Sequence, residues 1–126
     1  MTKAIMDNYY TNPIDELSIM ENKYTPFCAI ELNDYELFVN LLTVDLSKNI
    51  HMINESGQTL LMKAIEKENI PMVRCLINNG TDIYQMDYNY DMAEDYAKIV
   101  KNKDILQILL CRIQYEEMEW AKKKRC

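Results

Sequence analysis

The chain has 126 residues, of which 48 % are hydrophobic, and its 20 acidic and 14 basic side chains give a formal net charge of −6. This length and composition suit one packed domain, while the acidic balance argues against a general nucleic-acid binder, whose affinity would come from neutralising phosphates. The longest apolar runs fall far short of the roughly 20 residues that span a bilayer, and the start of the chain lacks the pattern of a signal peptide. We therefore expect a soluble, cytoplasmic protein without membrane contact.

Few residues could carry catalysis or bind a metal. His51 is the only histidine, so neither a His-based metal cluster nor a Ser-His-Asp triad can be built from this chain. The four cysteines include no C-x-x-C pair of a zinc site or redox motif. Cys75 and Cys111 lie on or beside apolar helical stripes, where we expect small buried thiols. We therefore expect no enzyme, no cofactor, no metal and no small-molecule substrate.

Two units precede the clearest pattern in the chain. Residues 1–21 are predicted to be a leader, in which 13–20 can form a helix that caps the helices after it; a partly disordered leader is the alternative. Residues 22–53 form the next unit. Two helices are predicted there, over residues 25–32 and 35–42. The remainder of that unit, residues 43–53, is irregular, and at its end the alternation of Ile50 and Met52 with His51 and Ile53 is compatible with a short extended arm.

Residues 54–86 predict a turn, two helices and a second turn. Thr59 stands at an N-cap position, and the apolar residues after it recur at helical spacing. Pro71 can begin the second helix, because its missing N–H would be an orphan there. That helix ends at Asn79-Gly80, where glycine adopts a positive φ readily. The apolar positions of the two helices are Leu60, Leu61, Ala64, Ile65, Met72, Val73, Leu76 and Ile77.

The same pattern recurs in a third unit, residues 87–111. A shift of 33 residues places Asn54 on Asp87, Ala64 on Ala97, Leu76 on Leu109 and Ile77 on Leu110. A backward shift of 35 residues gives a looser copy in residues 22–53. Because one such unit is too small to bury its own apolar face, its neighbours must stack on it. The period predicts an array of about three helix pairs.

Short motifs within these units carry a family resemblance. Residues 57–64, GQTLLMKA, are similar to G-x-T-P-L-H-x-A; residues 76–83, LINNGTDI, to L-L-x-x-G-A-D-V; and residues 92–97, MAEDYA, to T-A-x-D-x-A. Residues 25–29 give a partial match that is one residue short. The chain thus resembles the ankyrin-repeat family over about seven-tenths of its length. The resemblance implies an all-α solenoid of helix pairs, with short hairpin or turn connections, terminal capping helices and a noncatalytic role in protein–protein interaction.

After the third unit, residues 112–126 predict a charged extension in which the last helix continues. One face of that helix would carry Ile105, Leu106, Leu109, Ile113 and Trp120. The basic run 122–125 suits the negative end of a helix dipole. A solvated helix end is the simplest interpretation of this run, and a nuclear-import signal that would allow nuclear entry is the alternative.

In the resembled family, partners bind along the hairpin tips and the exposed side of each first helix. The resemblance therefore assigns partner contacts to Glu55, Ser56, Gln58, Glu66, Lys67, Tyr88, Asn89, Asp91, Ile99 and Val100, with Glu31 and Leu32 in the first repeat. For the charged members, a solvated face is the alternative. Ile99 and Val100 stand where the middle unit has a charged pair. Near Tyr88 and Tyr90 on the preceding turn they would form an apolar anchor with a polar rim, unless the C-terminal extension buries them.

The leading functional hypothesis is an intracellular adaptor or inhibitor that occupies the surface of a partner protein. The alternative is a structural or regulatory subunit held in a larger complex through its C-terminal helix. Frequent Asn, Ile, Lys and Tyr suggest an AT-rich coding genome. Such a genome is compatible with a virus, an intracellular bacterium or a protist, so a pathogen protein acting on host proteins is one interpretation.

Overall fold

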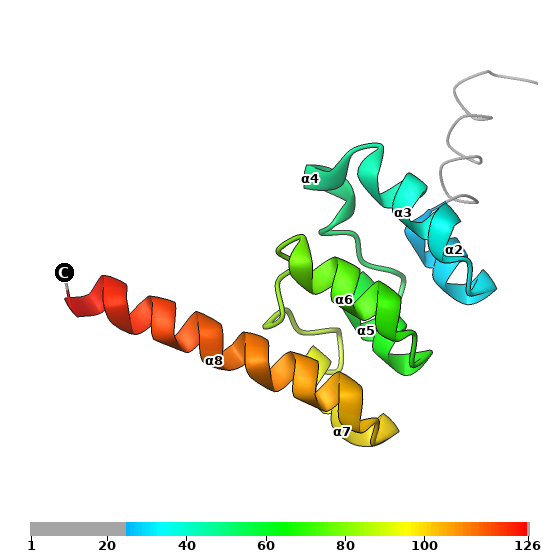
Figure 1. Ribbon diagram of the computed structural model, residues 1–126. Coiled ribbons are helices and arrows are strands. Elements are labelled where there is room, and N and C mark those ends of the chain that lie inside the picture. Colours follow the sequence, from blue (N-terminus) through cyan, green and yellow to red (C-terminus); the bar gives the residue numbers. More distant parts are fainter. Residues whose placement is uncertain (1–24, 126) are drawn as a thin grey trace, which may run out of the picture.

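Three helix pairs, each joined by a tight turn, make up the fold (Figure 1). The computed structural model describes residues 25–125, so the predicted leader and its helix lie outside the described residues. The helices are α2 (Pro26–Leu32), α3 (Tyr35–Thr43), α4 (Leu46–Asn49), α5 (Leu60–Glu66), α6 (Ile70–Asn78), α7 (Ala93–Val100) and α8 (Lys103–Arg125). Residues 25–125 contain no β-strand, and one isolated bridge pairs Ile53 with Thr59. The expected all-α architecture is confirmed.

The helix pairs stack in two layers. The first helices of the pairs, α2, α5 and α7, contact one another in sequence order, and so do the second helices, α3, α6 and α8 (Figure 1). The short helix α4 packs on α3. In such a stack stability comes largely from the interfaces between neighbouring pairs. The middle pair, α5 and α6, takes part in both interfaces.

The turn inside each helix pair is built in the same way. Its first residue is left-handed: Asn33, Glu68 and Lys101 have φ angles of 57°, 55° and 58°. The next residue caps the second helix, because its side chain accepts a hydrogen bond from the backbone N–H three residues later. These caps are Asp34, Asn69 and Asn102, with distances of 3.1, 3.1 and 3.2 Å. A short polar side chain therefore fixes the start of every second helix.

The same turns also connect neighbouring pairs. The side-chain amide of Asn69 donates to Oδ1 of Asn33, and that of Asn102 donates to Oε1 of Glu68 at 3.1 Å. In both asparagines Oδ1 caps the helix that follows, while Nδ2 reaches the preceding repeat. Each asparagine therefore serves as a helix cap and as a contact between repeats.

Apolar side chains of the middle pair fill the centre of the core. The exposed fraction is 0 % for Leu60, Leu61, Ala64, Ile65, Met72, Val73 and Leu76. Thr59 caps α5 by accepting from the backbone N–H of Met62 at 3.2 Å, as predicted. α6 ends just before Gly80, whose φ is 83°. It begins one residue before Pro71, so the proline occupies the second helical position rather than the first.

Two expectations for local segments are wrong. The extended arm expected at residues 50–53 does not form over its whole length, because Ile50 and His51 belong to the turn that follows α4, and only Ile53 pairs, in its bridge with Thr59. The side-chain amide of Asn49 donates to the carbonyl of Leu41 at 2.9 Å and folds α4 back on α3. The cysteines are also less buried than expected: Cys111 is exposed and Cys75 is half-buried. Both lie beside the apolar stripes of their helices rather than within them.

The last helix, α8, runs without a break for 23 residues, so the predicted extension is a continuation of the last repeat helix. Its beginning packs on α6 and α7, and its end extends past them (Figure 1). Trp120 is consequently 62 % exposed, although it shares the predicted apolar face with the buried Ile105 and Leu109. None of the helices in residues 25–125 has the combination of length and apolar composition that a membrane span needs.

Candidate protein-interaction surface

Two hairpin tips precede the first helices α5 and α7: the middle tip, residues 54–58, and the last tip, residues 87–91. In the middle tip, Oδ1 of Asn54 accepts from the backbone N–H groups two and four residues later, at 3.0 and 2.9 Å. In the last tip, Oδ1 of Asp87 accepts from the same two positions, at 2.8 and 2.9 Å. A backbone hydrogen bond closes each tip at 3.0 and 2.9 Å. Both tips are therefore preorganised by their first residue.

A chain of hydrogen bonds connects the two tips. Nδ2 of Asn54 donates to Oε1 of Gln58 at 2.8 Å, and Nε2 of Gln58 donates to Oη of Tyr96 at 3.0 Å. The hydroxyl of Tyr96 in turn donates to Oδ2 of Asp87 at 2.6 Å. This hydrogen bond lowers the pKa of the Asp87 carboxyl below its usual value. Burial, followed by the bond to Asp87, raises the pKa of Tyr96 to about 12.

This network gives Gln58 a structural role within the fold, and the partner contact expected of this residue stays a prediction. The side chain is 9 % exposed, and both ends of its amide are used within the fold. Sequence reasoning missed the role because Tyr96 lies 38 residues away. The neighbouring Glu55 and Ser56 are exposed, as a tip contact requires.

The last tip presents two tyrosines to solvent. Tyr88 is 65 % exposed and Tyr90 is 80 % exposed. The ring of Tyr88 covers Gly57, where an added Cβ would lie 2.6 Å from its Cδ1, and the backbone N–H of Tyr88 donates to the carbonyl of Ser56 at 3.2 Å. The last tip is thereby docked on the middle tip. Asn89 beside the tyrosines is exposed, and Asp91 is half-buried.

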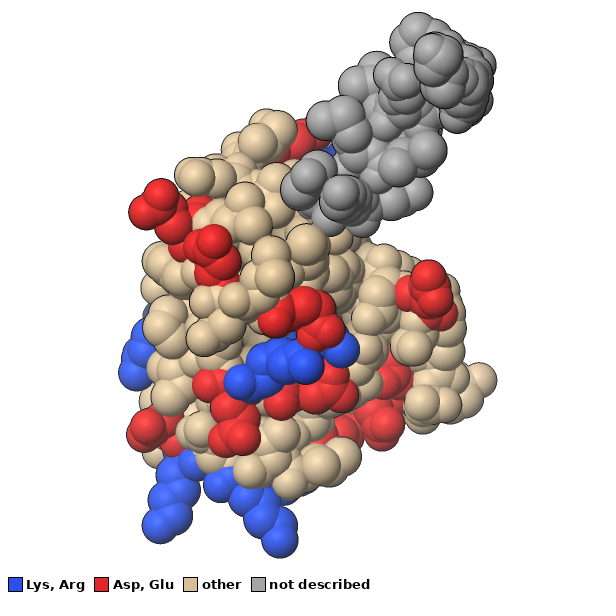
Figure 2. Space-filling view, turned by 90° about the vertical axis from the view of Figure 1, so that its right-hand side faces the viewer, with Lys and Arg blue, Asp and Glu red and all other residues tan. Residues whose placement is uncertain are grey.

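Ion pairs occupy much of the outer side of the first helices. Nζ of Lys67 lies 3.0 Å from Oε1 of Glu31 in the preceding repeat, and Nζ of Lys63 lies 3.0 Å from Oε1 of Glu66. The hydrogen bond from Lys67 lowers the pKa of Glu31. Figure 2 views the molecule from the right-hand side of Figure 1 and shows acidic and basic side chains interspersed over the described residues. The predicted contacts Glu66 and Lys67 are therefore exposed, and each is compensated within the chain, Glu66 by Lys63 and Lys67 by Glu31.

The repeated tips and turns agree with the comparison to known families. A family model described as ankyrin repeats, in three copies, matches residues 27–118. The chain belongs to the ankyrin-repeat family. It is thus a protein–protein interaction module. A comparison with curated proteins finds no match.

In the last ankyrin repeat, the predicted apolar pair is divided. Ile99 is 74 % exposed, whereas Val100 is half-buried and packs against the hydrophobic core. Both lie in the last turn of α7, while the tip tyrosines precede its first turn. Six residues of helix separate Ala93 from Ile99, which corresponds to about 9 Å along the axis. Ile99 and the last tip are therefore two separate exposed positions on one repeat.

Sequence reasoning also missed a polar substitution on α7. Glu94 and Lys98 stand 33 residues after Leu61 and Ile65, which have exposed fractions of 0 %. Oε2 of Glu94 lies 3.4 Å from Nζ of Lys98. The 33-residue period aligns Glu94 with Leu61 and Lys98 with Ile65, so the sequence itself carries the signal of this exchange of an apolar pair for an ion pair. It gives the outer face of the last repeat a polar surface.

Proposed function

We propose that this ankyrin-repeat protein is a noncatalytic adaptor or inhibitor in the cytoplasm, which binds a partner protein through the last tip and Ile99. The observation that carries the proposal is Tyr90. Its φ is 67° and it occupies the position of Gly57, whose φ is 79°. A left-handed conformation is unfavourable for a tyrosine. The strained position nevertheless holds an aromatic side chain that is 80 % exposed, which is understandable if a partner uses it.

The last tip also has the properties of an interface hot spot. Tyrosine is enriched at hot spots, because it offers a large apolar surface and a hydroxyl while few torsions become ordered on binding. Asp87 already fixes the tip backbone through two hydrogen bonds. The conformational entropy of this backbone is therefore largely lost during folding already, so that ordering it adds little to the cost of binding a partner.

The charged first-helix residues contribute less to this proposal. Glu66 and Lys67 each have an ion-pair partner within the chain, so a binding partner would have to displace or share it. Exposed ion pairs of this kind are worth about 0–1 kcal/mol. Ile99 is an apolar side chain, so a partner that binds it displaces no ion pair. It offers an apolar contact at the opposite end of α7.

Affinity capture with matched variants tests the proposal. The full chain and its Tyr88→Ser, Tyr90→Ser double variant serve as bait in cell lysate, together with Ile99→Glu and the control Tyr35→Ser, which removes another exposed tyrosine, on α3. We expect the captured partner to be lost with the tip variant and reduced with Ile99→Glu, while the control retains it. Capture at full yield by a folded tip variant would contradict the proposal, as would loss caused only by Tyr35→Ser.

A second candidate is a constitutive subunit that docks through α8. The observation in its favour is the exposure of large side chains on the end of this helix: Tyr115, Met118 and Trp120 are 55 %, 62 % and 62 % exposed. Light scattering distinguishes the two candidates. A constitutive subunit should self-associate or aggregate without its complex, whereas an adaptor should remain monomeric.

A further inference from the structure

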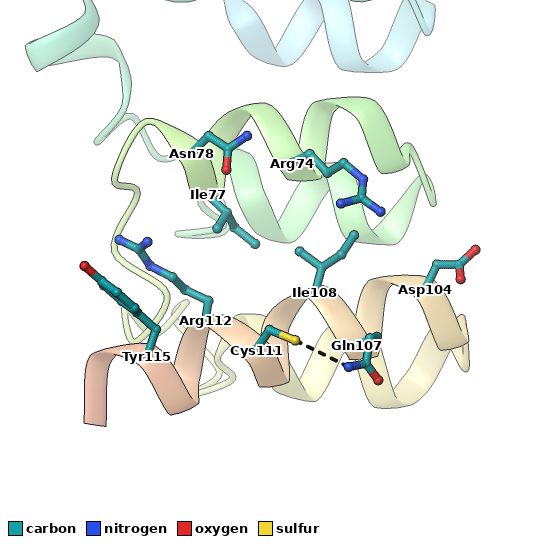
Figure 3. A pocket seen from close by; sticks show the side chains of 9 residues that line it. All are labelled: Arg74, Ile77, Asn78, Asp104, Gln107, Ile108, Cys111, Arg112 and Tyr115. Atoms are coloured by element: carbon teal, nitrogen blue, oxygen red, sulfur yellow. Dashed lines mark hydrogen bonds between the residues drawn. The ribbon is translucent and has the colours of Figure 1, made fainter. Parts of the chain in front are cut away.

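An open groove of about 390 Å³ runs between the second helices of the last two repeats. It lies on the layer opposite to the first helices, away from the surface of the proposed function. Figure 3 shows Ile77 of α6 and Ile108 of α8 projecting into the gap between the helices, with Arg74 and Arg112 reaching in from either side. Tyr115 closes one end. The groove thus has an apolar centre and polar sides.

The groove is basic although the chain has a net charge of −6. Arg74 and Arg112 line it together with a single carboxylate, that of Asp104. Arg112 is partly compensated, since its Nε lies 3.3 Å from Oε2 of Glu116 and its guanidinium carbon lies 5.2 Å from the centre of the Tyr115 ring. Among residues 25–125, no carboxylate forms an ion pair with Arg74. Arg74 is therefore an exposed cation beside an apolar surface, without an ion-pair partner in the described part of the chain.

We propose that this groove binds a short acidic peptide segment of a partner protein. An apolar side chain of the segment would lie between Ile77 and Ile108, and a neighbouring carboxylate would pair with Arg74. From Asp104 to Tyr115 α8 spans about 16 Å, a length that about five residues of extended peptide cover. The groove volume also falls in the range of about 300–1,000 Å³ that is usual for ligand sites.

Charge complementarity decides between occupants. A guanidinium binds a carboxylate through two parallel hydrogen bonds, a geometry that lysine cannot reproduce. A basic segment would face two arginines, and a purely apolar one would leave Arg74 partly desolvated without a partner.

Peptide selection tests the chemical class of the ligand. A display library of random short peptides is selected on the full chain carrying Tyr88→Ser and Tyr90→Ser, so that tip binders are not recovered. We expect enrichment of Asp or Glu next to Leu, Ile or Phe. Selection of neutral or basic peptides, or of no peptide, would overturn the proposal. Because the tips are altered in this experiment, its failure is independent of the function proposed above.

Affinities of a selected peptide then locate the contact. Arg74→Glu should weaken binding about tenfold or more, since it places a like charge opposite the peptide carboxylate. Arg74→Lys should have a smaller effect because it keeps the charge. Lys48→Glu on α4 is the control, with the same change of charge outside the groove. Equal affinities of Arg74→Glu and Lys48→Glu would overturn the assignment, even if both variants fold normally.

Cys111 provides an independent readout of the site. Its thiol lines the groove and is exposed, whereas Cys28 on α2 lies elsewhere. The rate at which iodoacetamide alkylates each cysteine is measured by mass spectrometry of the digested chain, with and without the selected peptide. Binding should slow the reaction of Cys111 and leave that of Cys28 unchanged. An unchanged rate at Cys111 under saturating peptide would show that the peptide binds elsewhere.

The chain itself contains a sequence with the proposed chemistry, and it must be tested as a competing occupant. Residues 14–17 read IDEL. If this segment filled the groove, an Asp15→Lys, Glu16→Lys double variant would bind the selected peptide more tightly than the unaltered chain. We expect the double variant to bind the selected peptide with unchanged affinity, which supports a segment of a partner protein as the occupant of the groove. Tighter binding, or a dimer that the peptide dissociates, would overturn the proposal in favour of the leader or a second copy.

Discussion

The middle and last repeats share one backbone design and differ in what that backbone exposes. In both, an Asn or Asp closes the tip, a left-handed residue joins the helices and an asparagine caps the second helix. Leu61 and Ile65 are fully buried in the middle repeat, whereas Glu94 and Lys98 form an ion pair at the equivalent positions. A further repeat stacked on α7 would have to bury both charges. A few side-chain exchanges on an unchanged backbone therefore make the outer face of the last repeat polar.

The second helices differ in the same manner. Gly80 lies just beyond the end of α6, with a φ of 83°, and the equivalent position 33 residues later is Ile113, within α8. Without a glycine to take the left-handed conformation, the helix continues for more than three turns. Ile77 is 6 % exposed under α8, while its equivalent Leu110 is 48 % exposed. The same position is core in one repeat and surface in the next.

The largest effect on stability is expected when the residues at one of these positions are exchanged between the two repeats. Leu61→Glu gives the middle repeat the residue that the last repeat has naturally. We expect a loss of unfolding free energy of about 3–5 kcal/mol, because an uncompensated charge would be buried between repeats. Urea denaturation followed by circular dichroism measures this change.

Glu94→Leu is the reciprocal control. It removes one member of an exposed ion pair, so the unfolding free energy should change by no more than about 1 kcal/mol. Equal destabilisation by the two substitutions would show that position 94 on α7 is as buried as position 61 on α5.

A smaller loss of unfolding free energy is expected when the hydrogen-bond chain between the two tips is interrupted at Tyr96. Tyr96→Phe leaves Nε2 of Gln58 without its acceptor and Oδ2 of Asp87 without its donor. Unsatisfied buried groups of this kind cost about 1–3 kcal/mol. The control Tyr84→Phe also removes a tyrosine hydroxyl, but from a side chain that is 46 % exposed. It should leave the unfolding free energy nearly unchanged. Thermal or urea denaturation that ranks the two variants equally would contradict a structural role for the network.

The pH dependence of this difference gives a sharper test. The pKa of Asp87 is lowered in the fold from 3.8, mainly by Tyr96, so its contribution is present above that pH and is lost as the pH falls through the folded pKa. The pKa of Tyr96 is raised from 10.0 to about 12, so its contribution is present below pH 10 and is lost as the pH rises toward 12. The difference in unfolding free energy between the unaltered chain and Tyr96→Phe should therefore become smaller at both low and high pH. A constant difference across the whole range would contradict these ionisation states.

Local signals in the sequence predict the repeat backbone but not how its surface is used. Thr59 and Gly80 act within a few residues of their own positions, so their roles as cap and stop could be predicted. The burial of Gln58 depends on Tyr96, a tertiary contact that no local pattern encodes. Ile99 and Val100 are adjacent, but successive helix residues are rotated by about 100°, so one faces solvent and the other the core. Such outcomes depend on the exact rotation of α7 against its neighbours.

Each tip has one residue with a positive φ, Gly57 in the middle tip and Tyr90 in the last tip. Substitutions at these two positions distinguish effects on stability from effects on binding. In the middle tip, Gly57→Ala would bring a Cβ to 2.6 Å from Cδ1 of Tyr88 at a φ of 79°. We expect a loss of about 1–2 kcal/mol, because an L-residue is disfavoured in this conformation even before the ring is displaced. A near-neutral effect in urea denaturation would show that the two tips are not packed together in solution.

In the last tip, Tyr90→Gly makes the reverse change and should give the smallest effect on stability, with the opposite sign. Relief of the strained φ of 67° should raise the unfolding free energy by up to about 1 kcal/mol, a gain reduced by the greater freedom of glycine in the unfolded chain. Partner capture should fall despite this gain, because the exposed ring is lost. If Tyr90→Gly lowered stability, the tyrosine would be serving the fold. If stability rose and capture stayed the same, the strain at position 90 would have no role in binding. Only increased stability together with weaker capture supports the last tip as the contact that distinguishes this repeat from the middle one.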